Sequence, residues 1–141
     1  MTQLTLALAN RIIESALVEA RARGYRPMAV AVLDDAGNLK ALQRDDGASM
    51  LRSDIAIGKA WAAIGMGTSS RPLVERAKDL PAFFNALAAT GRGRFIPQTG
   101  AVLIKDETGR ILGAVGASGG TGDEDEAICM RGVETAGLHH T

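Results

Sequence analysis

Charged and small polar residues in three stretches of the sequence could together hold a carboxylate. Arg44 and Lys59 would supply positive charge, and Asp45 or Asp46 could act as a base. The amides after Ser118 could bind an oxyanion. The candidate catalytic residues are Lys59, Asp46 and Ser118, and the candidate ligand-binding residues are Arg44, Asp46, Lys59, Ser118, Gly119 and Gly120. Such a set could support isomerisation, dehydration or decarboxylation of a small carboxylate metabolite.

Each of these candidates also has a purely structural interpretation. Lys59 lies in a nearly all-apolar helical segment, where a buried ammonium needs a carboxylate or a ligand anion, or else it extends over alanines into solvent. Arg44, Asp45 and Asp46 could instead form a turn and pair with one another in solvent. Replacing Lys59 by methionine is expected to abolish ligand binding with little effect on stability. A large stability loss would instead indicate a structural ion pair.

The glycine-rich stretch from Gly113 to Gly120 precedes a segment that begins with four acids, Asp123 to Glu126. A glycine loop before a helix often binds phosphate, but these acids would repel it, so they are better explained as partners of the helix dipole. Thr121 and Glu124 have the spacing of a capping box. Neither the dinucleotide fingerprint nor the P-loop is present. The loop therefore favours a small ligand or a close backbone contact over a nucleotide.

The composition argues against several classes of partner. The 16 basic and 16 acidic residues cancel, and aromatic residues are few, which argues against binding to nucleic acid or to an anionic membrane surface. Cys129 is the only cysteine, so no disulfide or multi-cysteine metal site can form within the chain. A buried structural thiol is expected there. No apolar run is long enough for a membrane span, so we expect a cytoplasmic protein. We also predict no metal site.

Hydrophobic periodicity predicts helices at 6–23, 49–66, 72–89 and 122–137, and strands at 28–33, 39–43, 102–104 and 111–115. A further strand is expected near Pro97. Both strand pairs flank turns with aspartate at the first position and glycine at the fourth, which predicts two antiparallel hairpins. The fold class is therefore α/β (α+β), with a mostly antiparallel sheet of about five strands packed with helices, in one domain spanning 1–141.

Several sequence blocks, taken together, resemble the GlcG/HbpS family. They are 28–39 (MAVAVLDDAGNL), 44–48 (RDDGA), 54–60 (DIAIGKA), 113–120 (GAVGASGG) and Asp125-Glu126. This family also includes the C-terminal domain of PduO-type cobalamin proteins. The resemblance implies a profilin-like sandwich, assembly into homo-oligomers, and a catabolic accessory or sensor role in which several members bind haem.

Two hypotheses follow for the function. The first is a small-ligand-binding accessory protein whose ligand is haem or a small metabolite. The second is an isomerase-type or lyase-type enzyme that acts on a small polar carboxylate. No histidine lies near Ser118 to activate it as a nucleophile. The only histidines, His139 and His140, are at the end of the sequence, so an internal haem would need Tyr25, Cys129 or a methionine as its ligand.

Overall fold

The computed structural model describes residues 2–141 and contains nine regular elements. The elements, in chain order, are α1 (Leu6–Ala22), β1 (Ala29–Asp34), β2 (Leu39–Arg44), α2 (Met50–Met66), α3 (Ser70–Asp79), α4 (Pro81–Thr90), β3 (Ala101–Lys105), β4 (Ile111–Ser118) and α5 (Gly122–Thr135). The strands form one antiparallel sheet in the order β2-β1-β4-β3. No helix within residues 2–141 combines the length and apolarity needed to cross a membrane.

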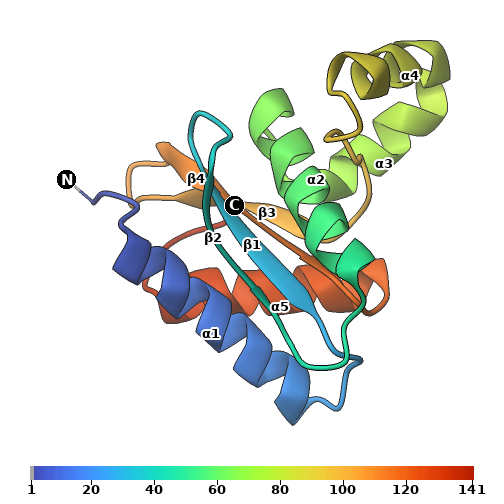
Figure 1. Cartoon of the computed structure of the whole chain (residues 1–141). Coiled ribbons are helices and arrows are strands. Elements are labelled where there is room, and N and C mark those ends of the chain that lie inside the picture. The colour runs from blue at the N-terminus through green and yellow to red at the C-terminus, as the bar shows by residue number, and fades with distance from the viewer. Residues whose placement is uncertain (1) are drawn as a thin grey trace.

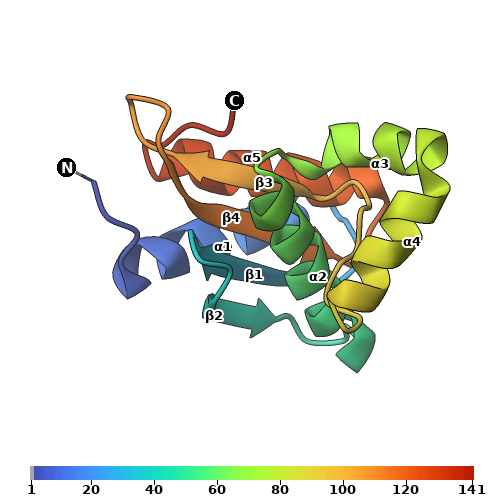
Figure 2. The ribbon, with the colours of Figure 1, turned by 90° about the horizontal axis from the view of Figure 1, so that it is seen from above.

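Helices cover both faces of the sheet (Figures 1 and 2). On one face, α1 and α5 pack through Ile12, Ile13 and Ile128 against Val30 and Val115. On the other face, the small residues of α2 pack against β1, β3 and β4. The central strand β1 is buried on both faces because its side chains alternate between these two cores. The sequence-predicted α/β class is confirmed.

The helix α2 lies unusually close to β4, at Gly116. A Cβ atom at that position would overlap the carbonyl oxygen of Ala56 and lie 3.0 Å from the amide nitrogen of Ala60. Glycine on the strand and alanines on the helix therefore allow the two backbones to approach each other. This contact fixes the position of α2, and so of its side chains Arg52 and Lys59, relative to the end of β4.

Two predictions about the elements were wrong. The sheet has four strands, because the segment 95–99 pairs with no strand and only the Gly100 carbonyl accepts a hydrogen bond from β4, at Ala117. The Ile96 amide instead donates to the carbonyl of Gly58 in α2 at 3.2 Å. The single helix expected over 72–89 is two helices, α3 and α4. They separate at Leu80, which has φ −128° and ψ 59° because the following residue, Pro81, disfavours the helical conformation before it.

Both predicted hairpin turns form, and an aspartate organises each of them. In the second turn, the Asp106 carboxylate accepts hydrogen bonds from the Thr108 hydroxyl at 2.7 Å, from the Thr108 and Arg110 amides, and from the Arg110 guanidinium. Gly109 closes the turn with φ +87°. These hydrogen bonds, the Thr108 hydroxyl first, lower the pKa of Asp106 to about 2.

The lowered pKa predicts a specific loss of stability in acid. An unfolded aspartate titrates near pH ~3.9, so the native state binds fewer protons than the unfolded state between that pH and about 2. The contribution of Asp106 is therefore complete above pH ~4 and disappears as the pH falls towards 2. The variant Asp106→Asn should show a shallower acid dependence in urea unfolding across this window. The exposed neighbour variant Glu107→Gln controls for the loss of one negative charge; an equal change in both variants would contradict the prediction.

Candidate ligand-binding site

A cleft of about 250 Å³ opens where the start of α2, the turn after β2 and the loop after β4 meet. Its lining residues are Arg26, Pro27, Gly47, Ala48, Ser49, Arg52 and Gly119. None of these described lining residues is acidic. The amino terminus of α2 also faces this region, and its first turn, 50–53, has no acid in the sequence. Two arginines and a helix dipole therefore make the cleft attractive to an anion.

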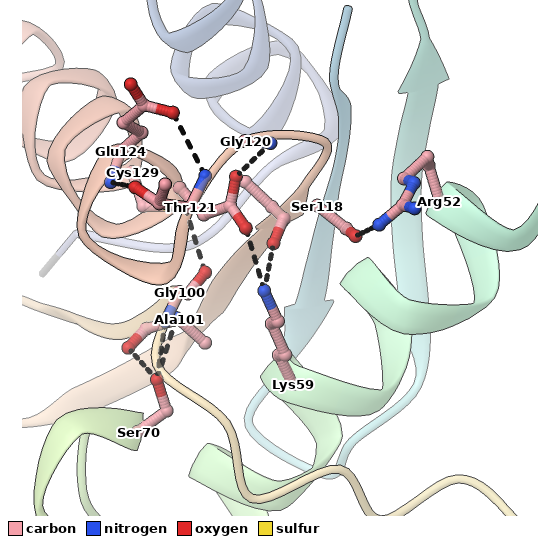
Figure 3. A network of polar contacts seen from close by, with 12 residues as sticks. Arg52, Lys59, Ser70, Gly100, Ala101, Ser118, Gly120, Thr121, Glu124 and Cys129 are labelled. Carbon is pink, nitrogen blue, oxygen red and sulfur yellow. Dashed lines mark hydrogen bonds and ion pairs between the residues drawn. The ribbon is translucent and has the colours of Figure 1, made fainter. Parts of the chain in front are cut away.

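Arg52 is the half-buried cation of this cleft. It projects from the first turn of α2, and its Nη1 donates a hydrogen bond to the Ser118 hydroxyl at 3.2 Å (Figure 3). Ser118 ends β4 and is itself buried. Only one guanidinium nitrogen takes part in this contact, so Arg52 retains donors for a ligand carboxylate.

The loop after β4 packs against the segment before β1 with no space for a side chain. A Cβ atom at Gly119 would overlap the carbonyl oxygen of Pro27, and its φ is +154°. The Gly120 amide donates to the Asp125 carboxylate at 2.9 Å. The Thr121–Glu124 capping box predicted from the sequence forms, with bonds of 3.2 Å and 3.0 Å. The loop is therefore fixed at both ends, and its glycine backbone forms one wall of the cleft.

Beneath this loop, Lys59 and Asp125 form a buried ion pair. The Lys59 ammonium lies 2.9 Å from the Asp125 carboxylate and donates a second hydrogen bond to the carbonyl of Ala117 at 3.0 Å. The two residues are only 5% and 2% exposed. Figure 3 shows Lys59 extending from α2 towards the loop, beside Ser118. Burial raises the pKa of Asp125, and the charge of Lys59 opposes that shift.

A second cleft of about 360 Å³ adjoins the first. Its lining residues are Gly24, Tyr25, Arg26, Gly120, Thr121 and Glu124. The two clefts share Arg26, and consecutive glycines, Gly119 and Gly120, line one each. The Tyr25 hydroxyl accepts a hydrogen bond from Arg23 at 3.2 Å. A ligand that spans both clefts could therefore contact Arg52 in the first cleft, Tyr25 in the second, and Arg26 between them.

The structure brings some of the sequence-predicted site residues together and separates others. The glycine loop and the turn after Arg44 do meet, because Gly47 and Gly119 line the same cleft. Asp46 is exposed, and the Arg44 guanidinium donates to the carbonyl of Ala48. Neither side chain lines the cleft described here, and their roles in binding or catalysis stay predictions.

Two structural interpretations from the sequence need correction. Of the two alternatives for Lys59, extension into solvent is wrong, because Asp125 inside the protein pairs with its ammonium group. Asp125 lies in the first turn of α5, as expected of a partner of the helix dipole, and it is in addition buried. Asp45 pairs with Arg21 of α1 through two 3.0 Å hydrogen bonds, rather than with the neighbouring arginine. This contact holds the pKa of Asp45 below its usual value.

Sequence reasoning missed the two arginines that line the first cleft. Arg52 was detectable, because it lies seven residues before Lys59 and so on the same stripe of α2. Asp125 was detectable as well. It begins the buried stripe of α5, which continues through Ile128, Cys129 and Gly132 at helical spacing. Arg26 lies in an irregular segment, and no pattern in the sequence assigns it to the cleft.

The chain matches the model of the HbpS-like family, described as haem degrading protein HbpS-like, over residues 4–134, and it therefore belongs to this family. A curated relative from Citrobacter freundii, an uncharacterized 15.0 kDa protein in the dhaT-dhaS intergenic region, is 29% identical over 93% of this chain and 90% of its own length. The fold is similar to that of the PduOC haem complex, with a TM-score of 0.87, 22% identity and 99% coverage of both chains. A double mutant of HbpS from Streptomyces reticuli aligns with a TM-score of 0.82, 26% identity and coverage of 96% of this chain and 88% of its own.

Proposed function

We propose that this protein is a small-ligand-binding accessory protein whose ligand carries at least one acidic group, and that haem is the first ligand to test. The observation that carries the proposal is the pairing of Arg26 and Arg52 in one cleft with no acid among its described lining residues. Haem suits this arrangement because its two propionates match two guanidinium groups. The family description and the haem complex of a structural relative support the same choice.

The two clefts offer one side chain able to bind haem iron, but few apolar side chains to pack against the porphyrin ring. Haem iron takes histidine, thiolate, methionine or tyrosine as an axial ligand, and Tyr25 lines the cleft that adjoins the two arginines. When bound, haem would supply an iron centre for ligand exchange or electron transfer. The residues of the chain would bind the propionates through Arg26 and Arg52, place the phenol of Tyr25 at the second cleft, and limit access through the fixed glycine loop.

The enzyme hypothesis gains no support from the geometry. An isomerase or lyase built on Lys59 would need its ammonium group in contact with the substrate carboxylate. That ammonium is instead enclosed between Asp125 and the carbonyl of Ala117. A ligand in the cleft would meet Arg52 first. The described contacts therefore favour a binding role over catalysis by the predicted set.

The test is a haemin titration followed by absorbance, using the tag-free wild type and the variant Arg52→Ala. Losing a charge-assisted hydrogen bond should weaken binding by roughly tenfold to a hundredfold. The control is Arg11→Ala, which removes an exposed arginine of α1 and should leave the affinity unchanged. A variant truncated before His139 separates binding in the cleft from binding by the terminal histidines.

The outcomes separate the ligand choice from the site. Equal affinities for Arg52→Ala and Arg11→Ala would overturn the assignment of the cleft. An absorbance shift that disappears on truncation, or no saturable shift, would overturn haem as the ligand. A thermal-shift screen of small carboxylic acids with the same two variants would then test the cleft independently of haem, and stabilisation unaffected by Arg52→Ala would overturn the site as well.

A further inference from the structure

We infer that the outer edge of β2 is a surface through which two copies of this chain pair, with their β2 strands antiparallel and centred on Ala41. This inference does not rest on the proposed function, because it concerns the edge of the sheet and not the ligand of the clefts. The observation that carries it is a difference between the two edges of the sheet. The backbone of β3 is capped on its outer side, whereas that of β2 is open.

The edge of β3 is capped by two serines at the start of α3 and by the end of the chain. The outward amides and their acceptors are Ala101 with the Ser70 hydroxyl at 2.8 Å, Leu103 with the Ser69 hydroxyl at 3.0 Å, and Lys105 with the His139 carbonyl at 2.7 Å. The Ser70 hydroxyl also donates to the Ala101 carbonyl at 3.0 Å. Another strand therefore cannot pair with this edge unless it displaces these groups.

The corresponding backbone groups of β2 have no such cap. The Asp45 amide donates to the Met28 carbonyl at 2.9 Å, which fixes the alternation of hydrogen bonds between β2 and β1. Because neighbouring residues of a strand direct their backbone groups to opposite sides, those of Ala41 face β1, and those of Lys40 and Leu42 face outward. Within residues 2–141 no hydrogen bond reaches these outward groups. Figure 2 shows β2 and β3 at opposite edges of the sheet.

The capped edge of β3 determines which arrangement of two copies can form. Pairing of β2 with β3 of another copy would be head-to-tail and could continue without closing, but β3 has no free backbone groups to offer. Pairing of β2 with β2 is related by a two-fold axis, so the two strands are antiparallel and no open edge remains for a third copy. A second copy of this chain is therefore the occupant that the open edge fits.

The charges on β2 select the register of this pairing. The strand carries Lys40 and Arg44 and no acid. Two registers overlap most of the strand. An axis at Leu42 would place Lys40 opposite Arg44, and like charges directly opposite each other are destabilising. An axis at Ala41 instead places Lys40 opposite Leu42 of the other copy, and both of these residues have outward backbone groups that can bond to each other.

Apolar side chains around the open edge would add to the contact. A stable interface buries about 800 Å² on each partner, which is more than the backbone of one short strand provides. The helices that contact β2 are α1 and α2. These two helices and β2 carry most of the exposed large apolar side chains of residues 2–141, namely Leu6, Val18, Leu39, Met50 and Leu51. Such a grouping is expected of a surface that is covered by another protein chain.

The experiment is disulfide trapping of Ala41→Cys in the full chain, oxidised with diamide and followed by non-reducing electrophoresis. In the proposed register the two copies of residue 41 face each other with Cα atoms about 4.5 Å apart, which lies within the range of a disulfide. In the control, Gln43→Cys, the two thiols are offset by about 13 Å along the strands. Cys129 is buried and should give no background. Ala41→Cys should therefore form mostly covalent dimer, and Gln43→Cys little.

Size-exclusion chromatography with light scattering tests the edge without a cross-link. The wild type should be a dimer or an even-numbered multiple of it. Lys40→Pro removes an outward amide and none that bonds to β1, so it should raise the dissociation constant of the pair by about tenfold or more. Lys40→Ala keeps this amide, and Phe83→Ser removes an exposed apolar side chain of α4. Both should assemble like the wild type, and circular dichroism checks the fold of each variant.

Three results would overturn the inference. The first is a monomeric wild type at the highest concentration measured. The second is an assembled wild type in which Ala41→Cys forms no more covalent dimer than Gln43→Cys. The third is an assembly that Phe83→Ser dissociates and Lys40→Pro does not. If Lys40→Pro fails to fold, the trapping of Ala41→Cys still decides the question. The haemin and carboxylic acid titrations of Arg52→Ala test the cleft separately from all of these results.

Discussion

Replacing Lys59 by methionine should lower the free energy of unfolding by about 3–5 kcal/mol, because it leaves the Asp125 carboxylate buried without its partner. This expectation reverses the one drawn from the sequence, in which the same variant kept its stability. The measurement is urea unfolding monitored by circular dichroism. The expected loss of stability is large because the ammonium and carboxylate groups are both buried away from water.

The matched control is Lys78→Met, which breaks an exposed ion pair with Glu75 three residues earlier on α3. Exposed pairs contribute about 0–1 kcal/mol, so this variant should be close to the wild type. A double variant, Lys59→Met with Asp125→Leu, should recover much of the loss, because no unpaired charge remains. Similar small losses for Lys59→Met and Lys78→Met would show that the buried pair is not a structural necessity.

Replacing Gly116 by alanine should lower the free energy of unfolding by about 1–3 kcal/mol and also weaken ligand binding. The added methyl group would overlap the backbone of α2 at Ala56, and backbone cannot move aside as a flexible side chain can. Displacing α2 would move Arg52 away from Ser118 and change the first cleft. Urea unfolding and a haemin titration of the same preparation would measure both effects.

Gly65 provides the control for this substitution. It lies near the end of α2, and no atom would come within 4 Å of an added Cβ. Gly65→Ala should therefore stabilise the protein by about 0.5–1 kcal/mol, through helix propensity alone, with no effect on binding. If Gly116→Ala were as stable as the wild type, the close approach of α2 to β4 would not be what positions the helix.

Local sequence signals predicted most of the secondary structure because their causes are local. The hairpin at Asp106 follows from turn chemistry within five residues, and the capping box at Thr121 follows from a three-residue spacing. Pro81 also indicated the break between α3 and α4. The apolar pattern on both sides of it nevertheless favoured the prediction of a single helix. Whether a fifth strand forms depended on whether the segment 95–99 found a strand to pair with, and this is decided by tertiary structure.

The candidate site was only partly predictable because its contacts join residues far apart in the chain. Both the Arg52–Ser118 hydrogen bond and the Lys59–Asp125 ion pair span 66 residues. The sequence showed that a buried lysine would need an anion. It did not show whether a protein carboxylate or a ligand would supply that anion, because four consecutive acids begin α5. The inward direction of Asp125 is set by how α5 docks on the sheet.

The hydrogen bond from the Gly120 amide to Asp125 links the dynamics of the loop to the buried pair. Amides within the helices and strands are hydrogen-bonded to backbone carbonyls, whereas the Gly120 amide is bonded to a side chain that also neutralises Lys59. Its hydrogen can exchange with solvent only when the loop leaves the carboxylate. The exchange rate of this single amide would therefore report how often the wall of the cleft opens, separately from unfolding of the sheet beneath it.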